Sequence, residues 1–273
     1  MKRTLMTLTI LIAAVPAFAG VVYQVETRDL TSSPPQTSDG TISAQGTLLK
    51  MQMQSAGSSF NGEMIFRGDR REMVIVNHDE KTVMIIDEAT MKAMADQIGQ
   101  AMAAMDQALA ALPASQRQKM EEMMKSRMPM QAEPPAPAEI RATGDTETIN
   151  GYPATRYEVW REGAKERELW VTEWSNVEGG DEVSGAFQQM AGFMKSLLES
   201  LPDVGGIKSA GDNAFAYLEE MKGFPVMTRE FSDAGTVEFE SELTSSEKQD
   251  LDPATFEPPA GYKQQDLKKM MGR

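Results

Sequence analysis

The sequence predicts an α+β protein in which a large antiparallel β-sheet is covered by amphipathic, methionine-rich helices. Three short apolar runs, Met64–Phe66, Met73–Val76 and Val83–Ile86, are separated only by short polar turns, which is the pattern of an antiparallel meander. From Met91 onward, apolar residues then recur at steps of three and four, which is the spacing of one helix face. The second half of the chain repeats this order of strands, helices and strands.

Residues 1–19 are predicted to be a secretory signal peptide. Lys2 and Arg3 form its basic end, Leu5–Val15 its apolar core and Ala17–Ala19 its small-residue exit. Cleavage leaves Gly20 first and changes the formal charge from −14 to −16, because two basic residues and no acidic residue are lost. The apolar core is shorter than the roughly 20 residues that span a bilayer. We therefore expect residues 20–273 to be one domain in the periplasm, without stable membrane insertion.

The composition excludes several classes of site. The chain has no cysteine, which excludes disulfides, thiolate metal sites, thiol nucleophiles and a diacylglyceryl-cysteine anchor. The net negative charge repels phosphate backbones and anionic lipid head groups. We therefore expect no binding to nucleic acid and no adsorption to an anionic membrane.

The first strands differ in how much of their surface they expose. Val21–Asp29 is expected to be the first strand, and a Ser/Thr/Pro/Gly-rich loop is expected over Thr31–Gly40. Leu49, Met51 and Met53 alternate with polar residues, which predicts a half-solvated strand. The last two runs of the meander are apolar at every position, so both of their faces need cover. We expect the helical segment that follows to supply it.

The helix that follows the meander is expected to reach Leu112–Pro113. Its apolar face consists of Met91, Met94, Ile98, Met102, Met105 and Leu109. Ser115 and Gln118 have capping-box form for a second helix, which Pro129 ends. The Pro-rich stretch 129–139 has too few apolar residues to pack, so we expect an extended connector between the two halves of the domain.

In the second half, two turn pairs, Asn150-Gly151 and Glu162-Gly163, separate three expected strands. These strands are Ile140–Glu147, Tyr152–Trp160 and Glu168–Trp174. A helix then presents Phe187, Met190 and Met194 on one face. A short helix is expected through Phe215 and Leu218. The chain returns through the strands Phe224–Phe231 and Val237–Leu243, and the second of these has Glu238, Glu240 and Glu242 on a solvated face.

The order of these elements resembles a family of exported bacterial proteins known as a domain of unknown function. The signatures that carry the resemblance are Arg67–Asp87, Asn150-Gly151-Tyr152-Pro153, Glu168-Leu169-Trp170-Val171, Gly223-Phe224-Pro225-Val226 and Phe256–Tyr262. That family is similar in plan to the periplasmic outer-membrane lipoprotein carriers. The resemblance implies a curved sheet, an open half-barrel, whose concave face is covered by helices around an apolar cavity for acyl chains. The Met-rich segment Met91–Met128 departs from the carriers, and no carrier ligand-gating residue matches a position here.

No combination of residues predicts catalysis. His78 is the only histidine, and we expect it to be a solvent-exposed turn residue without partners. The neighbouring carboxylates Glu121 and Glu122, and Glu219 and Glu220, are spaced as on exposed faces. Phosphate-binding, dinucleotide-binding, zinc-protease and serine-hydrolase motifs are all missing from the sequence. We therefore expect a protein that is not an enzyme and that needs no metal or cofactor.

The mature chain keeps 20 of the 22 methionines, because Met1 and Met6 belong to the signal peptide. Three interpretations of them remain open. They fill an ordinary core, or they form a deformable lining for an apolar ligand, or they bind Cu(I) at Met51-Gln52-Met53 and Met128-Pro129-Met130. The candidate lining is Met91, Met94, Ile98, Met102, Met105, Leu109, Phe187, Met190 and Met194.

The first functional hypothesis is therefore an exported, non-enzymatic binding protein that holds an apolar ligand between its sheet and its helices. An acyl chain or the lipidated segment of a partner protein fits that description. The alternative is an envelope structural or interaction protein with a filled core and no small ligand. Methionine-based handling of Cu(I) is a third hypothesis.

Overall fold

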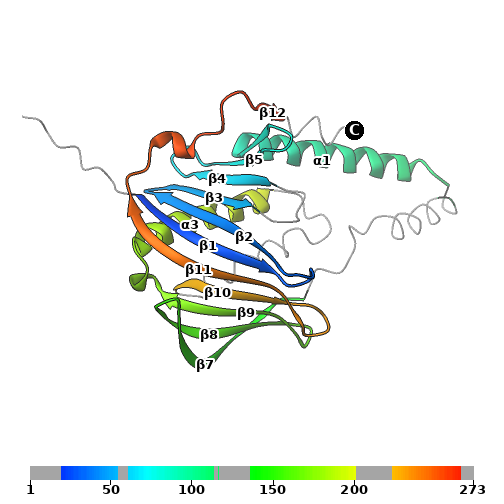
Figure 1. Ribbon diagram of the computed structural model, residues 1–273. Coiled ribbons are helices and arrows are strands. Elements are labelled where there is room, and N and C mark those ends of the chain that lie inside the picture. The colour runs from blue at the N-terminus through cyan, green and yellow to red at the C-terminus, as the bar shows by residue number, and fades with distance from the viewer. Residues whose placement is uncertain (1–19, 55–60, 114–115, 117–135, 201–222, 266–273) are drawn as a thin grey trace, which may run out of the picture.

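The structure is a computed structural model and describes residues 20–54, 61–113, 116, 136–200 and 223–265. The fold is built on one curved, open sheet of twelve strands (Figure 1). The strand order is β12-β6-β5-β4-β3-β2-β1-β11-β10-β9-β8-β7, and every neighbouring pair is antiparallel except β12 and β6. The predicted α+β class with an open antiparallel sheet is confirmed.

The first half of the chain forms one side of this sheet. Its strands are β1 (Gly20–Asp29), β2 (Gln36–Gln45), β3 (Leu48–Gln54), β4 (Asn61–Arg67), β5 (Glu72–Asn77) and β6 (Thr82–Asp87). The predicted meander corresponds to β4–β6. The loop expected over Thr31–Gly40 is wrong in its second part, because Gln36–Gly40 belongs to β2. Strand β1 pairs with all of this stretch and β3 with its last residue, so tertiary pairing overrides its weak strand propensity.

The second half completes the other side of the same sheet. Its strands are β7 (Glu139–Ile149), β8 (Tyr152–Arg161), β9 (Ala164–Glu173), β10 (Gly223–Phe231) and β11 (Val237–Gln249), followed by β12 (Lys263–Gln265). Asn150 and Gly151 both have positive φ, as the tight turn between β7 and β8 requires. The long pairing of β11 with β1 joins the two halves. The signal peptide, the helix over 115–128, connector residues 129–135 and the helix through Phe215 and Leu218 lie outside the described residues.

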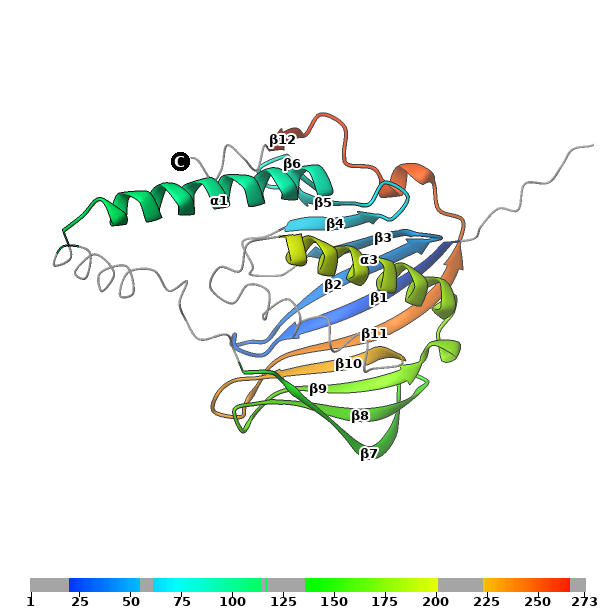
Figure 2. The same cartoon turned by 180° about the vertical axis from the view of Figure 1, so that it is seen from behind.

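Helix α3 (Gly180–Ser200) lies across the concave face of the sheet (Figure 2). It buries Val183, Ala186, Met190, Phe193 and Leu197. The same apolar cluster contains the sheet residues Leu49, Phe66 and Met73. The rings of Phe66 and Phe193 are 5.7 Å apart. This helix supplies the main apolar cover of the concave face.

Among the described residues, helix α1 (Glu88–Ala110) contacts the apolar core through its first two turns, with Met91, Met94 and Ala95. Asp87 caps it by accepting a hydrogen bond of 2.7 Å from the Thr90 amide. Met91 is buried and Met94 is half-buried, but Met102 is 39% exposed. Figures 1 and 2 show the helix leading away from the sheet. The structure thus differs from the expectation that the face from Met91 to Leu109 covers the sheet along its whole length, because a periodic stripe does not specify what lies beneath it. None of the described helices is long and apolar enough to cross a membrane.

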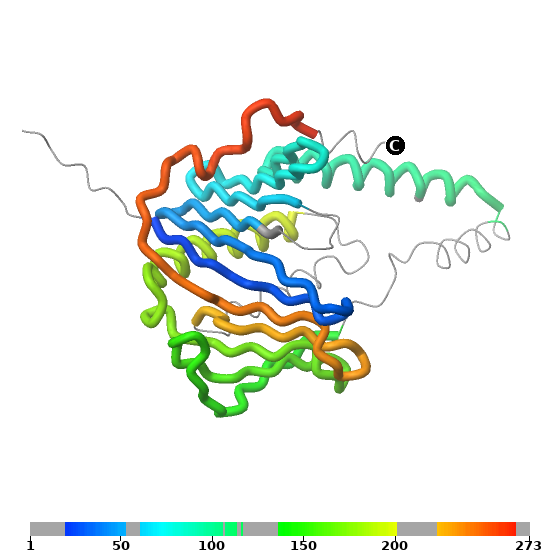
Figure 3. Tube along the Cα trace, viewed as in Figure 1, coloured from blue at the N-terminus to red at the C-terminus, as the bar shows by residue number. Residues whose placement is uncertain are grey.

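The convex face of β4–β6 is covered by the C-terminal segment Leu251–Gln265, which we call the strap (Figure 3). A second apolar cluster unites the strap residue Phe256, which is 1% exposed, with Ile65, Val74, Val76 and Val83. Glu257 of the strap forms ion pairs with Arg67 and Arg70. Both faces of the meander are therefore covered, as expected, but a helix supplies the cover on one face only.

We predict that substitutions of two helical methionines have different effects on stability. Met190→Ala removes a side chain that is packed on the sheet and should lower the free energy of unfolding by about 2–5 kcal/mol. Met102→Ala removes an exposed side chain and should cost less than about 0.5 kcal/mol. Urea unfolding of both variants measures the difference. Equal losses would show that the outer half of α1 is packed like the core.

A second prediction concerns the strap. Phe256→Ala should cost about 3–5 kcal/mol, because it opens a cavity beneath the convex face of the meander. It should also speed amide hydrogen exchange in β4–β6 more than in β8 and β9. Phe239→Ala is the matched control, since Phe239 is 37% exposed. Equal protection changes in both regions would contradict a local role for the strap.

Candidate functional site

An apolar cavity of about 210 Å³ lies between α3 and the sheet. Its main apolar lining consists of Val25, Ile42, Trp174, Phe187, Phe224 and Leu243. Trp174 connects the two sides, because its ring centroid lies 6.4 Å from that of Phe187 on α3 and 5.6 Å from that of Phe224 on β10. Thr228 and Ser241 add hydroxyl groups to the lining.

Two glycines allow the approach of α3 to the short 3-10 helix Trp174–Asn176. A Cβ atom on Gly180 would lie 1.9 Å from the carbonyl oxygen of Trp174. Gly179 has a φ of 63°, and a Cβ atom there would lie 2.0 Å from Val21. A larger residue at either position would push α3 away from the sheet. The glycine pair therefore allows the start of α3 to lie against the Trp174 carbonyl and Val21.

From the cavity, a row of apolar side chains continues across β2–β6. In strand register, Ile42 lies opposite Met51, Met51 opposite Met64, Met64 opposite Ile75 and Ile75 opposite Met84. Residues that face each other in adjacent strands lie on the same side of a sheet, so these five form one row, which we call the methionine track. All five are half-buried. Ile42 belongs to both the cavity and the track.

The sequence-predicted lining residues are distributed unevenly around this site. Phe187 lines the cavity. Met91 and Met190 are buried in the core, and Met94 and Met194 are half-buried against it. On α1, Ile98, Met105 and Leu109 are half-buried and Met102 is exposed. The structure thus brings together the residues of α3 and of the first turns of α1. Sequence reasoning missed the three methionines of the track. Their signal was their position, two residues along the strand from Leu49, Phe66 and Ile86, which lie in the neighbouring row of the sheet.

A more open, polar cleft of about 450 Å³ lies beside the cavity. Its lining includes Thr146 and Thr148 on β7, Thr155 on β8, Val171 and Glu173 on β9, and Asn176. In register, Val171 lies opposite Pro225 and Glu173 opposite Gly223, and both β10 residues line the apolar cavity. The cavity and the cleft are therefore neighbours on the same face of the sheet, separated by the β9–β10 pairing.

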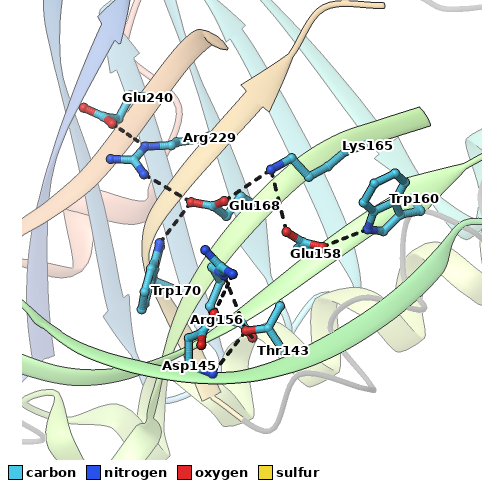
Figure 4. Close-up of polar contacts among 10 residues, drawn as sticks. All are labelled: Thr143, Asp145, Arg156, Glu158, Trp160, Lys165, Glu168, Trp170, Arg229 and Glu240. Carbon is cyan, nitrogen blue, oxygen red and sulfur yellow. Dashed lines mark hydrogen bonds and ion pairs between the residues drawn. The ribbon is translucent and has the colours of Figure 1, made fainter. Parts of the chain in front are cut away.

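A network of ion pairs crosses β8–β11 (Figure 4). It continues to β1, where Arg28 pairs with Glu240. At its centre, Glu168 accepts a hydrogen bond of 3.2 Å from the Trp170 indole and lies 3.1 Å from the Arg229 guanidinium and 3.4 Å from the Lys165 amine. Burial acts to raise the pKa of Glu168, but these three partners outweigh it and hold the pKa below its ordinary value. Arg229 continues the network to Glu240 at 2.6 Å.

This network lies on the opposite face of the sheet from the cavity. Thr228 and Ser241 line the cavity, Arg229 follows Thr228 and Glu240 precedes Ser241. Successive residues of a strand point to opposite faces of the sheet. The expectation that Glu240 lies on a solvated face is therefore wrong: its side chain is 13% exposed and pairs with both Arg28 and Arg229. The ion pairs that Glu240 forms with arginines of neighbouring strands shield its carboxylate from water, and the alternation of residues along one strand does not reveal them. The network holds five strands together, β8–β11 and β1, and is not part of the cavity.

His78 also differs from the sequence expectation. Its side chain is 20% exposed, with Nε2 3.2 Å from Glu63 Oε1 and Nδ1 2.8 Å from the Tyr262 hydroxyl. The Tyr262 partner belongs to the strap, which is distant in sequence. His78 is therefore an anchor between the meander and the strap. Within the described ranges, no group of three or more His, Cys, Asp or Glu side chains could hold a metal ion. Of the two Met-x-Met candidates for Cu(I), Met51 lies in the track and Met128–Met130 lies outside the described residues.

The lowered pKa of Glu168 leads to a prediction about pH. The ionised carboxylate stabilises the fold fully above the pKa of an unfolded glutamate, about 4.3, and this stabilisation is lost as pH falls through the lower folded pKa. Glu168→Gln should therefore cost about 1–3 kcal/mol at pH 7 and progressively less below about pH 4. Urea unfolding at both pH values checks this. A loss that did not depend on pH would point to packing instead of charge.

No protein-family model matches the sequence, and no curated protein matches it. Solved structures similar to this chain include an uncharacterized conserved protein from Thermus thermophilus. The two sequences are 7% identical, the alignment covers 91% of this chain and 90% of that chain, and the TM-score is 0.44. A DUF1329 family protein from Desulfovibrio piger is 7% identical in sequence, with 89% of this chain and 91% of that chain aligned and a TM-score of 0.29. A putative outer membrane lipoprotein-sorting protein domain from Vibrio parahaemolyticus is 8% identical in sequence, with 94% of this chain and 93% of that chain aligned and a TM-score of 0.29.

Proposed function

We propose that this protein is a non-enzymatic binding protein of the cell envelope that holds an apolar ligand between α3 and the concave face of the sheet. The observation that supports the proposal is the apolar cavity of about 210 Å³ behind Phe187 and Trp174. An unfilled apolar hollow of this size costs stability, because packed interiors have few voids larger than a water molecule, and a bound apolar ligand would recover part of that cost.

The dimensions of the site favour a single apolar chain. An apolar cavity of about 150 Å³ can hold one benzene molecule, so the cavity here takes one ring or the end of one aliphatic chain. The rest of such a chain has a place on the methionine track. The track crosses five strands, and with a spacing of about 4.8 Å between strands it is about 19 Å long. An acyl chain, free or attached to a partner protein, has this form.

The chemistry of the track supports a ligand of variable shape. Met51, Met64 and Met84 have unbranched, polarizable side chains that change rotamer at low cost. Surfaces built from methionine can therefore repack around different apolar partners. Half-buried side chains of this kind have space to move toward a ligand, in contrast to the fully packed row beneath α3.

The second candidate is an envelope interaction protein that binds no small ligand. The outer half of α1 supports it, because Met102 is 39% exposed on the same helix face as Ile98 and Met105. In that case the cavity would be empty in the cell and an apolar probe would find no saturable site.

Filling the cavity should abolish ligand binding. Val25→Phe places a ring into the space between β1 and α3, and should weaken binding of the fluorescent fatty acid cis-parinaric acid at least tenfold while changing stability by less than about 1.5 kcal/mol. Fluorescence titration and urea unfolding measure the two effects. Mass spectrometry under native conditions, on protein purified from its own envelope, should show a retained lipid mass.

The matched control is Val22→Phe, the same substitution three residues earlier on the same strand. Val22 alternates with the core residues Val21 and Tyr23 and so points to the other face of the sheet. It should leave probe binding unchanged. If wild-type protein showed no saturable binding and no retained lipid, the binding proposal would be wrong and the interaction protein would be favoured.

A further inference from the structure

We infer that the ligand is an amphiphile whose head group occupies the polar cleft beside the cavity, and that this head group is an ammonium or a neutral hydroxyl group and not an anion. The inference rests on the proposed function, and it adds the chemical class of the ligand. It is carried by the contact between an apolar cavity and a cleft of mixed lining, with hydroxyl, amide and carboxylate groups, on one face of the sheet.

The strand register places the two hollows directly side by side. Glu173 and Val171, which line the cleft, lie opposite Gly223 and Pro225, which line the cavity. Adjacent strands are about 4.8 Å apart, which is shorter than the length of four methylene groups in an extended chain. A molecule with its apolar end behind Phe187 can therefore place its polar end among the threonines of β7 and β8.

Beside the apolar Pro153 and Val171, the cleft face carries hydroxyl groups, one amide and one carboxylate. Thr146, Thr148 and Thr155 share a face by register, and their hydroxyl groups both donate and accept hydrogen bonds. Asn176 is held in place because its Nδ2 donates to the Thr172 hydroxyl at 3.1 Å. Glu173 supplies the one carboxylate on this face, since Glu147 alternates with Thr146 and Thr148 and so points to the other face.

The cations near this region are not available to a ligand in the cleft. The described lining of the cleft contains no lysine or arginine. Arg156, Lys165 and Arg229 lie within the ion-pair network, where each has a carboxylate partner. Register places Arg229 on the opposite face of the sheet. A phosphate, sulfate or carboxylate head group in the cleft would therefore meet Glu173 and no compensating charge, whereas an ammonium group would be attracted.

Three amphiphiles with the same chain test this inference on the complete mature protein. Decylamine, 1-decanol and decanoate differ only in carrying a cationic, a neutral or an anionic head group at pH 7.5. Their affinities are measured by displacement of cis-parinaric acid at about 0.15 M salt, where charges that are distant from the site are screened. We expect decylamine and 1-decanol to bind, and decanoate to bind several-fold more weakly than either.

The variant Glu173→Gln removes the charge of the cleft and keeps its shape. It should weaken decylamine about fivefold, the effect of one solvated charge pair at about 4 Å, strengthen decanoate and leave 1-decanol unchanged. The control is Glu199→Gln on the exposed surface of α3, which makes the same change in net charge. It should alter none of the three affinities, so a general effect of the acidic chain is separated from an effect of the cleft.

The outcomes distinguish this inference from the proposed function. If all three amphiphiles bind equally well, or if decanoate binds best, the head-group assignment is wrong while apolar binding stands. Equal effects of Glu173→Gln and Glu199→Gln would also overturn the assignment. If no amphiphile displaces the probe, and the probe itself does not bind, both the inference and the proposed function fail.

Discussion

The strands β4–β6 are apolar on both faces, and the rest of the architecture follows from that constraint. A sheet with two apolar faces is stable in water only if each face is covered. On one side α3 supplies the cover, with Phe193 against Phe66. On the other side the strap supplies it, with Phe256 among the valines of the meander. Helix α3 and the strap are distant in sequence, so covering both faces of the meander brings these two parts of the chain to the same strands.

A single helix is narrower than the curved sheet that it covers. Helix α3 buries the row that contains Leu49, Phe66 and Met73, and it leaves the next row, the methionine track, half-buried. The cavity lies at the end of the track where the helix, the 3-10 helix at Trp174 and the start of β10 meet. The proposed binding site is therefore a direct consequence of incomplete cover, and methionine suits such a place because it tolerates a changing environment.

The other half of the sheet is stabilised in a different way. Across β8–β11, the face opposite the cavity carries paired charges, with Glu168 and Glu240 each held by two cations. Because these carboxylates are satisfied within the sheet, this face needs no helix or strap to cover it. The polar cleft lies on the other face of β7–β9. The charge network thus adds to the apolar contacts of this half, where Val159, Leu169 and Val171 are buried on the face opposite the network.

The sequence alone determined the elements whose signals are local. The period of two in the meander, the period of 3.6 in α1 and α3 and the Asn150-Gly151 turn depend on neighbouring residues, so they were predictable. On the candidate site, the same periodicity identified Phe187 as part of an apolar helix face.

Only the tertiary structure decided which of these surfaces meet. It showed that the strap, and not a helix, covers the convex face, that His78 contacts Tyr262, and that Glu240 lies between two arginines. It also showed that α1 leaves the sheet after two turns and that Met51, Met64 and Met84 form one row. Each of these depends on contacts between residues far apart in the chain, which local periodicity does not encode, because a pattern specifies which face of an element is apolar but not the partner that covers it.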